Sequence, residues 1–145
     1  MRMTLELDLP RDSLTIPLAR HLARNTMREI GVDDDCVGDV EVALTEACTN
    51  VLDHSGPGDA YQVEFVIDGH ACSIRIVDVG DGFDSTEAGT VPAAAGAESG
   101  RGIALMRALV DQVEFESGRQ AGTVVLLHKN LVYAEGSPAN KLITD

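Results

Sequence analysis

The chain has 145 residues and a formal net charge of −13, with 11 Lys and Arg against 24 Asp and Glu. This length fits one domain with a single hydrophobic core. An acidic surface repels nucleic acid and anionic lipid, so we expect neither direct nucleic-acid binding nor membrane binding, and a basic protein is the favoured partner. No apolar run approaches the roughly 20 residues that span a bilayer, and the first residues do not form a secretion signal.

The three cysteines, Cys36, Cys48 and Cys72, are widely spaced, and none forms a CxxC motif with another. An odd number of cysteines without metal-ligand spacing favours reduced thiols in the core. We therefore expect a cytoplasmic protein.

The chain begins with a predicted strand and helix. Residues 3–9 alternate apolar and polar side chains, which predicts an amphipathic strand. A helix should follow, capped by Asp12 or Ser13. It should end near Ile30, because Gly31 can adopt the left-handed conformation that stops a helix.

Three arginines, Arg20, Arg24 and Arg28, recur at a spacing of four along this first helix. At that spacing they share one side of the helix. Such a stripe is often only solvated charge. In a chain with 11 Lys and Arg residues, however, three aligned arginines are also a candidate surface for binding a partner protein.

A second helix and a pair of strands come next. The carboxylates of Asp33–Asp35 suit a helix N-terminus, and the helix should run to about His54. The Ser-Gly-Pro-Gly run at 55–58 should end it. Strands are expected at 61–67 and 72–79, joined by a tight turn.

The last third of the chain is predicted to hold a loop, a helix and two strands. Residues 85–99 are small, polar and rich in Gly and Ala, which indicates a loop that we interpret as a lid. Residues 103–110 should be helical, and residues 112–116 and 123–129 alternate like strands. The segment from Ala134 onward is expected to be poorly ordered.

These elements predict the order β-α-α-β-β-lid-α-β-β. We expect an α/β (α+β) two-layer sandwich, with a mixed, mostly antiparallel sheet and helices on one face. Residues 1–133 should form a single domain, and residues 134–145 a flexible tail.

The second helix carries a polar stripe. Glu46, Asn50 and Asp53 stand at positions i, i+4 and i+7 and so fall on one side of it. An Asn oxygen is a neutral ligand that suits Mg²⁺. A Glu one turn earlier can act as a general base or orient a group beside a γ-phosphate. A stripe that simply faces solvent is the alternative.

Asp78 is the last residue of a predicted strand and is followed by Gly80 and Gly82. Ligand sites form at strand ends in α/β folds. A carboxylate there can accept a hydrogen bond from an exocyclic amine such as adenine N6, and the glycines let the backbone approach a flat base. An ordinary Asp-Gly turn is the alternative.

Gly100 and Gly102 flank Arg101 where the third helix is predicted to begin. Helix N-termini present free N–H groups to anions, and Arg101 adds a cation that can reach a phosphate. The spacing differs from that of a Walker P-loop, and the position differs from that of a dinucleotide-binding motif.

Three segments in this order, EACTNVLDH, DVGDGFD and ESGRGIALM, resemble the N, G1 and G2 boxes of the GHKL ATPase superfamily. This superfamily has a Bergerat-type ATP-binding fold and includes the histidine kinases. The short form and the string EACTNVLDH are similar to the anti-sigma factor serine/threonine kinases of the RsbW/SpoIIAB group. The resemblance covers residues 5–130.

The resemblance implies ATP and Mg²⁺ as cofactors and gives roles to named residues. Glu46 would be the catalytic base, Asn50 would bind Mg²⁺ and Asp78 would recognise adenine. Residues 85–99 would form the ATP lid. The other residues implied in nucleotide binding are Asp53, Gly80, Gly82, Gly100, Arg101, Gly102, Ile103 and Thr123.

The resemblance also implies a biological role. A homodimer would sequester a sigma factor and phosphorylate a serine of an anti-anti-sigma partner with a STAS domain. Two alternatives stay open. One is a non-catalytic module whose nucleotide state switches its grip on a partner. The other is a switch kinase that acts on a phosphatase.

Overall fold

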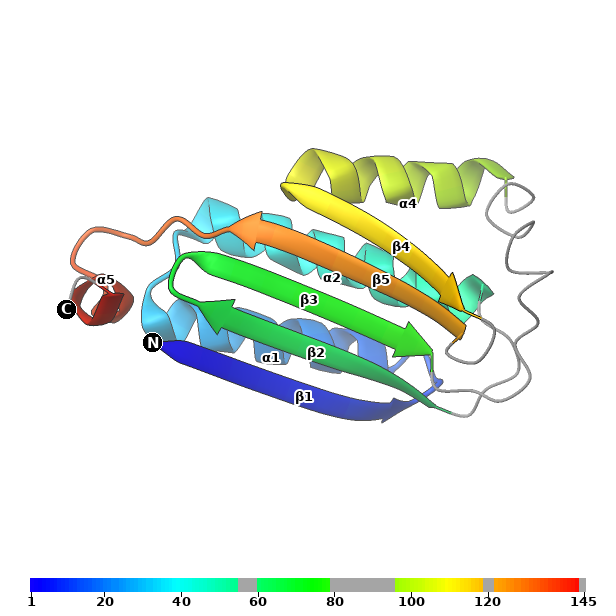
Figure 1. The fold of residues 1–145 in the computed structure, drawn as a ribbon, viewed down its shortest axis with the longest axis horizontal. Helices are drawn as coiled ribbons and strands as arrows, with labels where there is room; N and C mark the ends of the chain where they lie inside the picture. Colours follow the sequence, from blue (N-terminus) through cyan, green and yellow to red (C-terminus); the bar gives the residue numbers. More distant parts are fainter. Residues whose placement is uncertain (55–59, 79–95, 119–121, 144–145) are drawn as a thin grey trace.

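A computed structural model of the chain describes residues 1–54, 60–78, 96–118 and 122–143 (Figure 1). The elements in chain order are β1 (Arg2–Pro10), α1 (Thr15–Ile30), α2 (Asp34–His54), β2 (Ala60–Asp68), β3 (Ala71–Asp78), α4 (Gly96–Leu109), β4 (Gln112–Gly118), β5 (Gly122–Asn130) and α5 (Pro138–Ile143). The strands form one sheet in the order β1-β2-β3-β5-β4.

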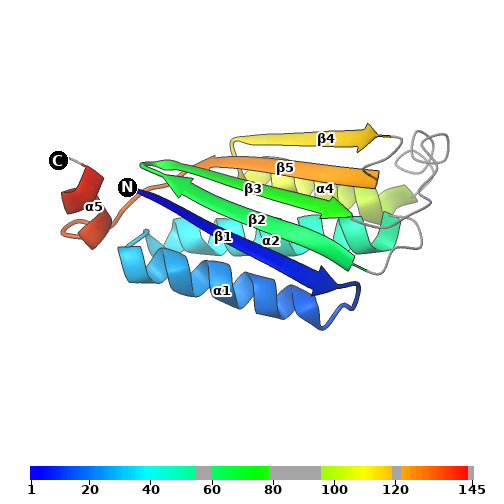
Figure 2. The ribbon, with the colours of Figure 1, turned by 60° about the horizontal axis from the view of Figure 1, so that its bottom comes forward.

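The molecule has two layers. Figure 2 shows α1, α2 and α4 together on one face of the sheet. Every strand pairing that the structure describes is antiparallel. The predicted two-layer fold is confirmed, and its mostly antiparallel sheet is antiparallel throughout the described strands.

The core lies between the sheet and the helices, where alternate strand residues meet the apolar helix faces. In β1 this alternation places Met3, Leu5 and Leu7 against the core, as predicted. The buried thiols belong to the same core, and burial raises the pKa of Cys48 and of Cys72 to about 12. All three free thiols are buried, which supports their interpretation as core residues.

The start of α1 differs from the prediction. The residue that precedes the helix is Leu14, and no side chain caps it. Asp12 instead accepts a hydrogen bond from the Leu14 N–H at 2.9 Å, which makes a turn before the helix. The predicted end is confirmed, since Gly31 follows the helix with φ 89°.

The third helix also begins earlier than predicted. α4 starts at Gly96, so residues 96–99, expected to be the end of the lid, are helical. Ala97 and Glu98 are strong helix formers, and a helix tolerates an isolated glycine at a cost of about 1 kcal/mol. Arg101 therefore lies in the second turn of α4 rather than at its N-terminus.

The C-terminal segment differs from the predicted flexible tail, because α5 is a helix. Ser137 precedes it and accepts a hydrogen bond from the Asn140 N–H at 3.3 Å, while Pro138 occupies the first helical position. Serine and proline favour these positions at a helix start. Ser137 and Ala139 are buried, so the segment packs against the domain.

Candidate functional site

The polar stripe of α2 lies at the border of its buried face. Glu46 and Asn50 are half-buried, whereas Asp53 is exposed. The fully buried residues beside them are Val40, Ala43, Leu44, Ala47, Cys48 and Val51. Glu46 and Asn50 thus do not simply face solvent, and the structure separates Asp53 from them in burial.

Gly102 brings α4 against Glu46. A Cβ atom at Gly102 would lie 3.0 Å from Glu46 Oε2, closer than ordinary van der Waals contact. A side chain at position 102 would require the flexible Glu46 carboxylate to move by a few tenths of an ångström. This contact brings the segment EACTNVLDH of α2 beside the segment ESGRGIALM of α4.

The residues on either side of Gly102 differ in burial. Arg101 is exposed, and Ile103 is half-buried and packs against the core. Gly100 lies within α4. Burial thus distinguishes the exposed Arg101 from the packed Ile103 within one helical turn.

Asp78 is the last residue of β3 and has an exposed fraction of 1%. Val77 pairs with Val124, so Asp78 and Thr123 are the next residues along two neighbouring strands. Thr123 is half-buried. A deeply buried carboxylate beside a threonine hydroxyl at a strand end is an arrangement that suits recognition of a polar group on a flat ligand.

Tyr61 stands opposite Asp78 on β2. Its hydroxyl lies 2.6 Å from Thr15 Oγ1, which ties the start of α1 to the sheet. Burial raises the Tyr61 pKa to about 12, against the lowering effect of the Thr15 hydrogen bond. Tyr61 is therefore a neutral hydroxyl at any physiological pH.

Part of the predicted site lies outside the described residues. Gly80 and Gly82 fall in 79–95, as does most of the predicted lid. The run predicted to end α2 falls in 55–59.

A groove runs between α1 and α2, with a volume of about 360 Å³. It is lined by Arg20, Arg24, Gly38, Glu41, Val42, Thr45 and Glu46. Arg24 is held there by Glu41, with Nε and Oε1 at 3.7 Å. Arg28 is exposed and is not among the lining residues. The groove places two of the three predicted partner-binding arginines beside the predicted base.

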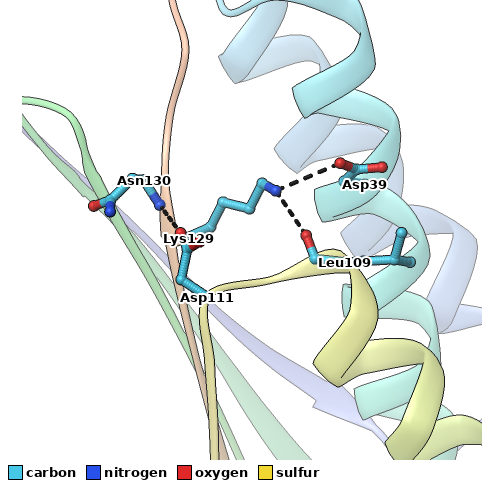
Figure 3. A network of polar contacts seen from close by, with 5 residues as sticks. All are labelled: Asp39, Leu109, Asp111, Lys129 and Asn130. Carbon is cyan, nitrogen blue, oxygen red and sulfur yellow. Dashed lines mark hydrogen bonds and ion pairs between the residues drawn. The ribbon is translucent and has the colours of Figure 1, made fainter.

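Two cations that fix the helix ends were missed in the sequence. Arg11 Nη2 donates to the Leu52 carbonyl at 2.6 Å, near the C-terminus of α2. Lys129 donates to the Leu109 carbonyl at the end of α4 at 2.7 Å and lies 3.4 Å from Asp39 on α2 (Figure 3). Cations stabilise the negative end of a helix.

These contacts set the positions of the two helices that carry Glu46, Asn50 and Gly102. The bonded residues stand 41 positions apart for Arg11 and Leu52, and 20 apart for Lys129 and Leu109. A sequence pattern within one element gives no signal for such pairs.

Within residues 1–54, 60–78, 96–118 and 122–143, no three His, Cys, Asp or Glu side chains gather in a way that could hold a metal ion. Nor do these ranges contain a helix with the length and apolar character needed to cross a membrane.

The geometry agrees with comparisons to known proteins. Residues 9–129 match the model of the "Histidine kinase-like ATPase domain" family. The chain belongs to this family. The resemblance to the GHKL superfamily is thereby confirmed over nearly the whole sequence.

Individual relatives carry names from the predicted group. The chain is 28% identical over 137 residues to the "Serine-protein kinase RsbW" of Halalkalibacterium halodurans, covering 88% of this chain and 83% of the relative. It is 27% identical over 105 residues to the "Anti-sigma F factor" of Clostridium acetobutylicum, covering 68% and 73%.

Among solved structures, the RsbU and RsbW domains of a Mycobacterium tuberculosis protein superimpose with a TM-score of 0.69 at 21% identity. The alignment covers 89% of this chain and 32% of that chain. At this identity the likeness shows the fold alone.

Proposed function

We propose that this protein is an Mg-ATP-dependent serine/threonine kinase and anti-sigma factor. It phosphorylates a serine of a STAS-domain anti-anti-sigma partner and sequesters a sigma factor. The names of its relatives support this proposal. The observation that carries it is the groove that joins Arg20 and Arg24 to Glu46, because a kinase needs its protein-docking surface to lead to its base.

The described residues fit a nucleotide. Asp78 is a buried hydrogen-bond acceptor at the end of β3, with Thr123 beside it, and suits an adenine amine. Asn50 is half-buried, one turn after Glu46, and its oxygen suits Mg²⁺. Further binding roles fall to Asp53, Gly80, Gly82, Gly100, Arg101, Gly102, Ile103 and Thr123.

The chemistry that we propose is phosphoryl transfer to a serine hydroxyl. ATP would give up its γ-phosphoryl group and leave as ADP, and Mg²⁺ held by Asn50 would neutralise charge on the phosphates. Glu46 accepts the proton of the attacking hydroxyl, which makes the oxygen a better nucleophile. Gly102 leaves the Glu46 carboxylate room beside α4.

Binding of the partner is assigned to Arg20, Arg24 and Arg28. Arg20 and Arg24 line the groove, and the exposed Arg28 extends the stripe along α1. The net charge of −13 favours capture of a sigma factor, because sigma factors are basic over the surfaces that bind DNA. The same proposal makes the protein a cytoplasmic homodimer.

The test is incubation of the protein with labelled Mg·ATP and STAS-domain proteins from the same genome. We expect label on a serine of one candidate, and loss of that label with Asn50→Ala. Tight nucleotide binding without transfer to any candidate would favour the nucleotide-gated module. Label on a phosphatase regulator instead would favour the switch kinase. Absence of nucleotide binding would contradict the proposal altogether.

A further inference from the structure

The described helices cover the five-stranded sheet on one side. Figure 2 shows α1, α2 and α4 on that side, and Figure 1 looks onto the other face, over which none of the described helices lies. We call this second face the open face. Its side chains come from alternate strand residues, since the residues between them point into the core. An uncovered sheet face is a surface on which another element can pack.

The strand register arranges the open face in rows that cross the sheet. One row runs from β1 to β4 through Glu6, Glu64, Arg75, Leu126 and Glu114. The next row runs through Asp8, Gln62, Val77, Val124 and Glu116. Both rows thus carry carboxylates at the two edges of the sheet and apolar side chains between them.

A hollow of about 150 Å³ opens on β1, β2 and β3 at these two rows. Its polar lining residues are Glu6, Asp8, Gln62, Glu64 and Arg75. A cavity needs only about 10–15 Å³ to hold a water molecule. The hollow therefore has room for the end of a long side chain.

The hollow carries more negative than positive charge. The carboxylates of Glu6, Asp8 and Glu64 line it, against the guanidinium of Arg75. Within the described part of the chain, none of these four side chains takes part in an ion pair. Glu6 and Glu64 stand directly opposite each other, and like charges in that position are destabilising. A cation from outside would pair with these carboxylates and relieve the repulsion.

The excess of negative charge extends over the whole open face. The charged side chains of the described strands that point to it are Arg2, Glu6, Asp8, Glu64, Asp68, Arg75, Glu114 and Glu116. Six are carboxylates and two are guanidinium groups, so their net charge is −4. The helix layer differs, because Arg20 and Arg24 line its groove. The open face therefore repels a second face like its own and attracts a basic one.

Apolar side chains form the middle of the open face. Val66 and Leu126 are half-buried there. Val77 and Val124 have exposed fractions of 9% and 3%. Arg75 lies beside Leu126, and the stem of an arginine adds apolar area. A partner that packs on this strip would remove its remaining apolar area from water, which favours association.

The dimensions of the open face match one helix. Four strand spacings of about 4.8 Å separate β1 from β4, which makes about 19 Å. A helix with its side chains is about 10–12 Å across, so one helix fits between the two edges. Long basic side chains on its flanks would reach the carboxylates on either side. β1 has nine residues and is about 30 Å long, which matches a helix of about 20 residues.

From these observations we infer that the open face docks a basic amphipathic helix of a partner protein. The apolar stripe of that helix packs on Val66 and Leu126. An arginine or lysine on one flank enters the hollow beside Glu6 and Glu64, and basic residues on the other flank face the glutamates of β4. This surface lies on the opposite layer from the groove between α1 and α2. It is a second docking surface, beyond the proposed function.

A synthetic peptide tests the chemistry of the partner. The probe is a fluorescent helix of about 20 residues with a stripe of leucines and arginines on both flanks. The control peptide has the same composition, with its leucines spread around the helix. We expect the probe to bind about tenfold more tightly than the control in fluorescence anisotropy at about 0.15 M salt. Equal affinities would reveal unspecific attraction between opposite charges and would overturn the inference.

Glu6→Arg tests the hollow. It sets a cation of the chain itself opposite Glu64, which replaces a like-charge pair by an opposite-charge pair. We expect the variant to unfold at a higher urea concentration than the natural chain and to bind the probe about tenfold more weakly. A folding defect would not produce both changes together. Glu29→Arg, at an exposed position of α1, makes the same charge change on the helix layer and should bind the probe normally. Equal binding by the two variants would overturn the inference.

Leu126→Gln tests the apolar strip. It keeps the charge of the open face and removes apolar area from its middle, so the probe should bind about fivefold more weakly. Val132→Gln is the matched control, because Val132 is 60% exposed and lies near the C-terminal segment. It should leave the affinity unchanged. An unaltered affinity for Leu126→Gln would contradict the packing of the helix on this strip.

Methyl resonances locate the bound peptide. Those of Val66 and Leu126 should shift when the probe is added, whereas those of the exposed Leu18 on α1 and Leu142 on α5 should not. Shifts confined to the helix layer would overturn the inference. A Leu126 resonance that moves with protein concentration alone would mean that a second copy covers the face, which contradicts a partner helix. Phosphoryl transfer is measured separately, so its failure would overturn the proposed function and leave this surface standing.

Discussion

At one end of the sheet the C-terminal segment packs over the α1–α2 turn and the β2–β3 turn, while at the other end α2, β3 and α4 present polar side chains. At the first end, Tyr133 Oη donates to the Gly69 carbonyl at 2.6 Å, and the Ala134 N–H donates to the Gly31 carbonyl at 2.8 Å. Figure 1 shows α5 at this end, opposite the C-terminus of β3.

The site end carries Glu46, Asn50 and Asp78, whose acidic and amide groups suit a ligand and its metal. We call the end with the C-terminal segment the closed end. There, hydrogen bonds join that segment to the β2–β3 turn and to the α1–α2 turn and so hold the domain together. The difference predicts that the proposed chemistry depends on the site end, while the contacts of the C-terminal segment serve stability alone. Changes at the closed end should therefore alter folding, and changes at the site end should alter binding and transfer.

Asp78→Asn is expected to have the largest effect on binding. It replaces one oxygen of a buried hydrogen-bond acceptor at the site end with an N–H donor. Losing a charge-assisted hydrogen bond to the nucleotide amounts to about 1.5–3 kcal/mol, or roughly 10- to 150-fold in Kd. Isothermal titration with Mg·ATP measures it. Asp68→Asn, at the far end of the β2–β3 pair, is the matched control and should bind normally.

Gly31→Ala should cause the largest loss of stability at the closed end. Its φ of 89° strains any side chain, and a Cβ there would lie 2.2 Å from Ser137 Cβ. We expect a loss of about 2 kcal/mol in the free energy of unfolding, measured by urea denaturation, with nucleotide affinity retained.

Gly38→Ala is the matched control for that change. Beyond the adjoining helix backbone, no atom lies within 4 Å of a Cβ at Gly38, which is inside α2. The substitution should raise the free energy of unfolding by about 0.5–1 kcal/mol. A loss of stability as great as that of Gly31→Ala would show that replacing a glycine destabilises the closed end no more than it destabilises α2.

Gly102→Ala tests whether the approach of α4 positions the Glu46 carboxylate. The added methyl group would crowd Glu46 Oε2 and turn the carboxylate away. We expect transfer to fall by about tenfold, or roughly 1.4 kcal/mol. The free energy of unfolding should change little, because alanine favours the helix and offsets the crowding. Unchanged transfer would mean that this contact does not position Glu46.

Tyr133→Phe should weaken the closed end less than Gly31→Ala does. It removes the hydrogen bond to the Gly69 carbonyl and keeps the ring contact with His70. The expected loss is about 1 kcal/mol in the free energy of unfolding, without a change in nucleotide affinity. Altered affinity would mean that the two ends are coupled.

Much of the fold follows from local patterns in the sequence. The alternation of residues 3–9 predicts β1, and Gly31 and Gly69 mark turns in which each has positive φ. In these segments the backbone conformation follows from residues that are close together in the sequence. The start of α5 carries such a signal as well, in Ser137 followed by Pro138.

The assembled site required more than local pattern. The sequence proposes Glu46, Asn50 and Asp78 one by one, whereas the approach of Gly102 to Glu46 depends on how α4 packs on α2. Lys129 fixes that packing through residues 90 and 20 positions away. α4 begins at Gly96 because Ala97 and Glu98 favour a helix. The Gly- and Ala-rich composition of residues 85–99 instead predicts a loop there.

Glu46→Gln, assayed for both nucleotide affinity and transfer, tests the central claim most directly. A single-turnover measurement on the complex with Mg·ATP and a STAS-domain acceptor gives the transfer rate, and titration gives Kd. If Glu46 is the base, transfer should fall by a factor on the order of 10²–10⁴ with Kd nearly unchanged. Undiminished transfer would contradict the claim that Glu46 performs the chemistry of this site.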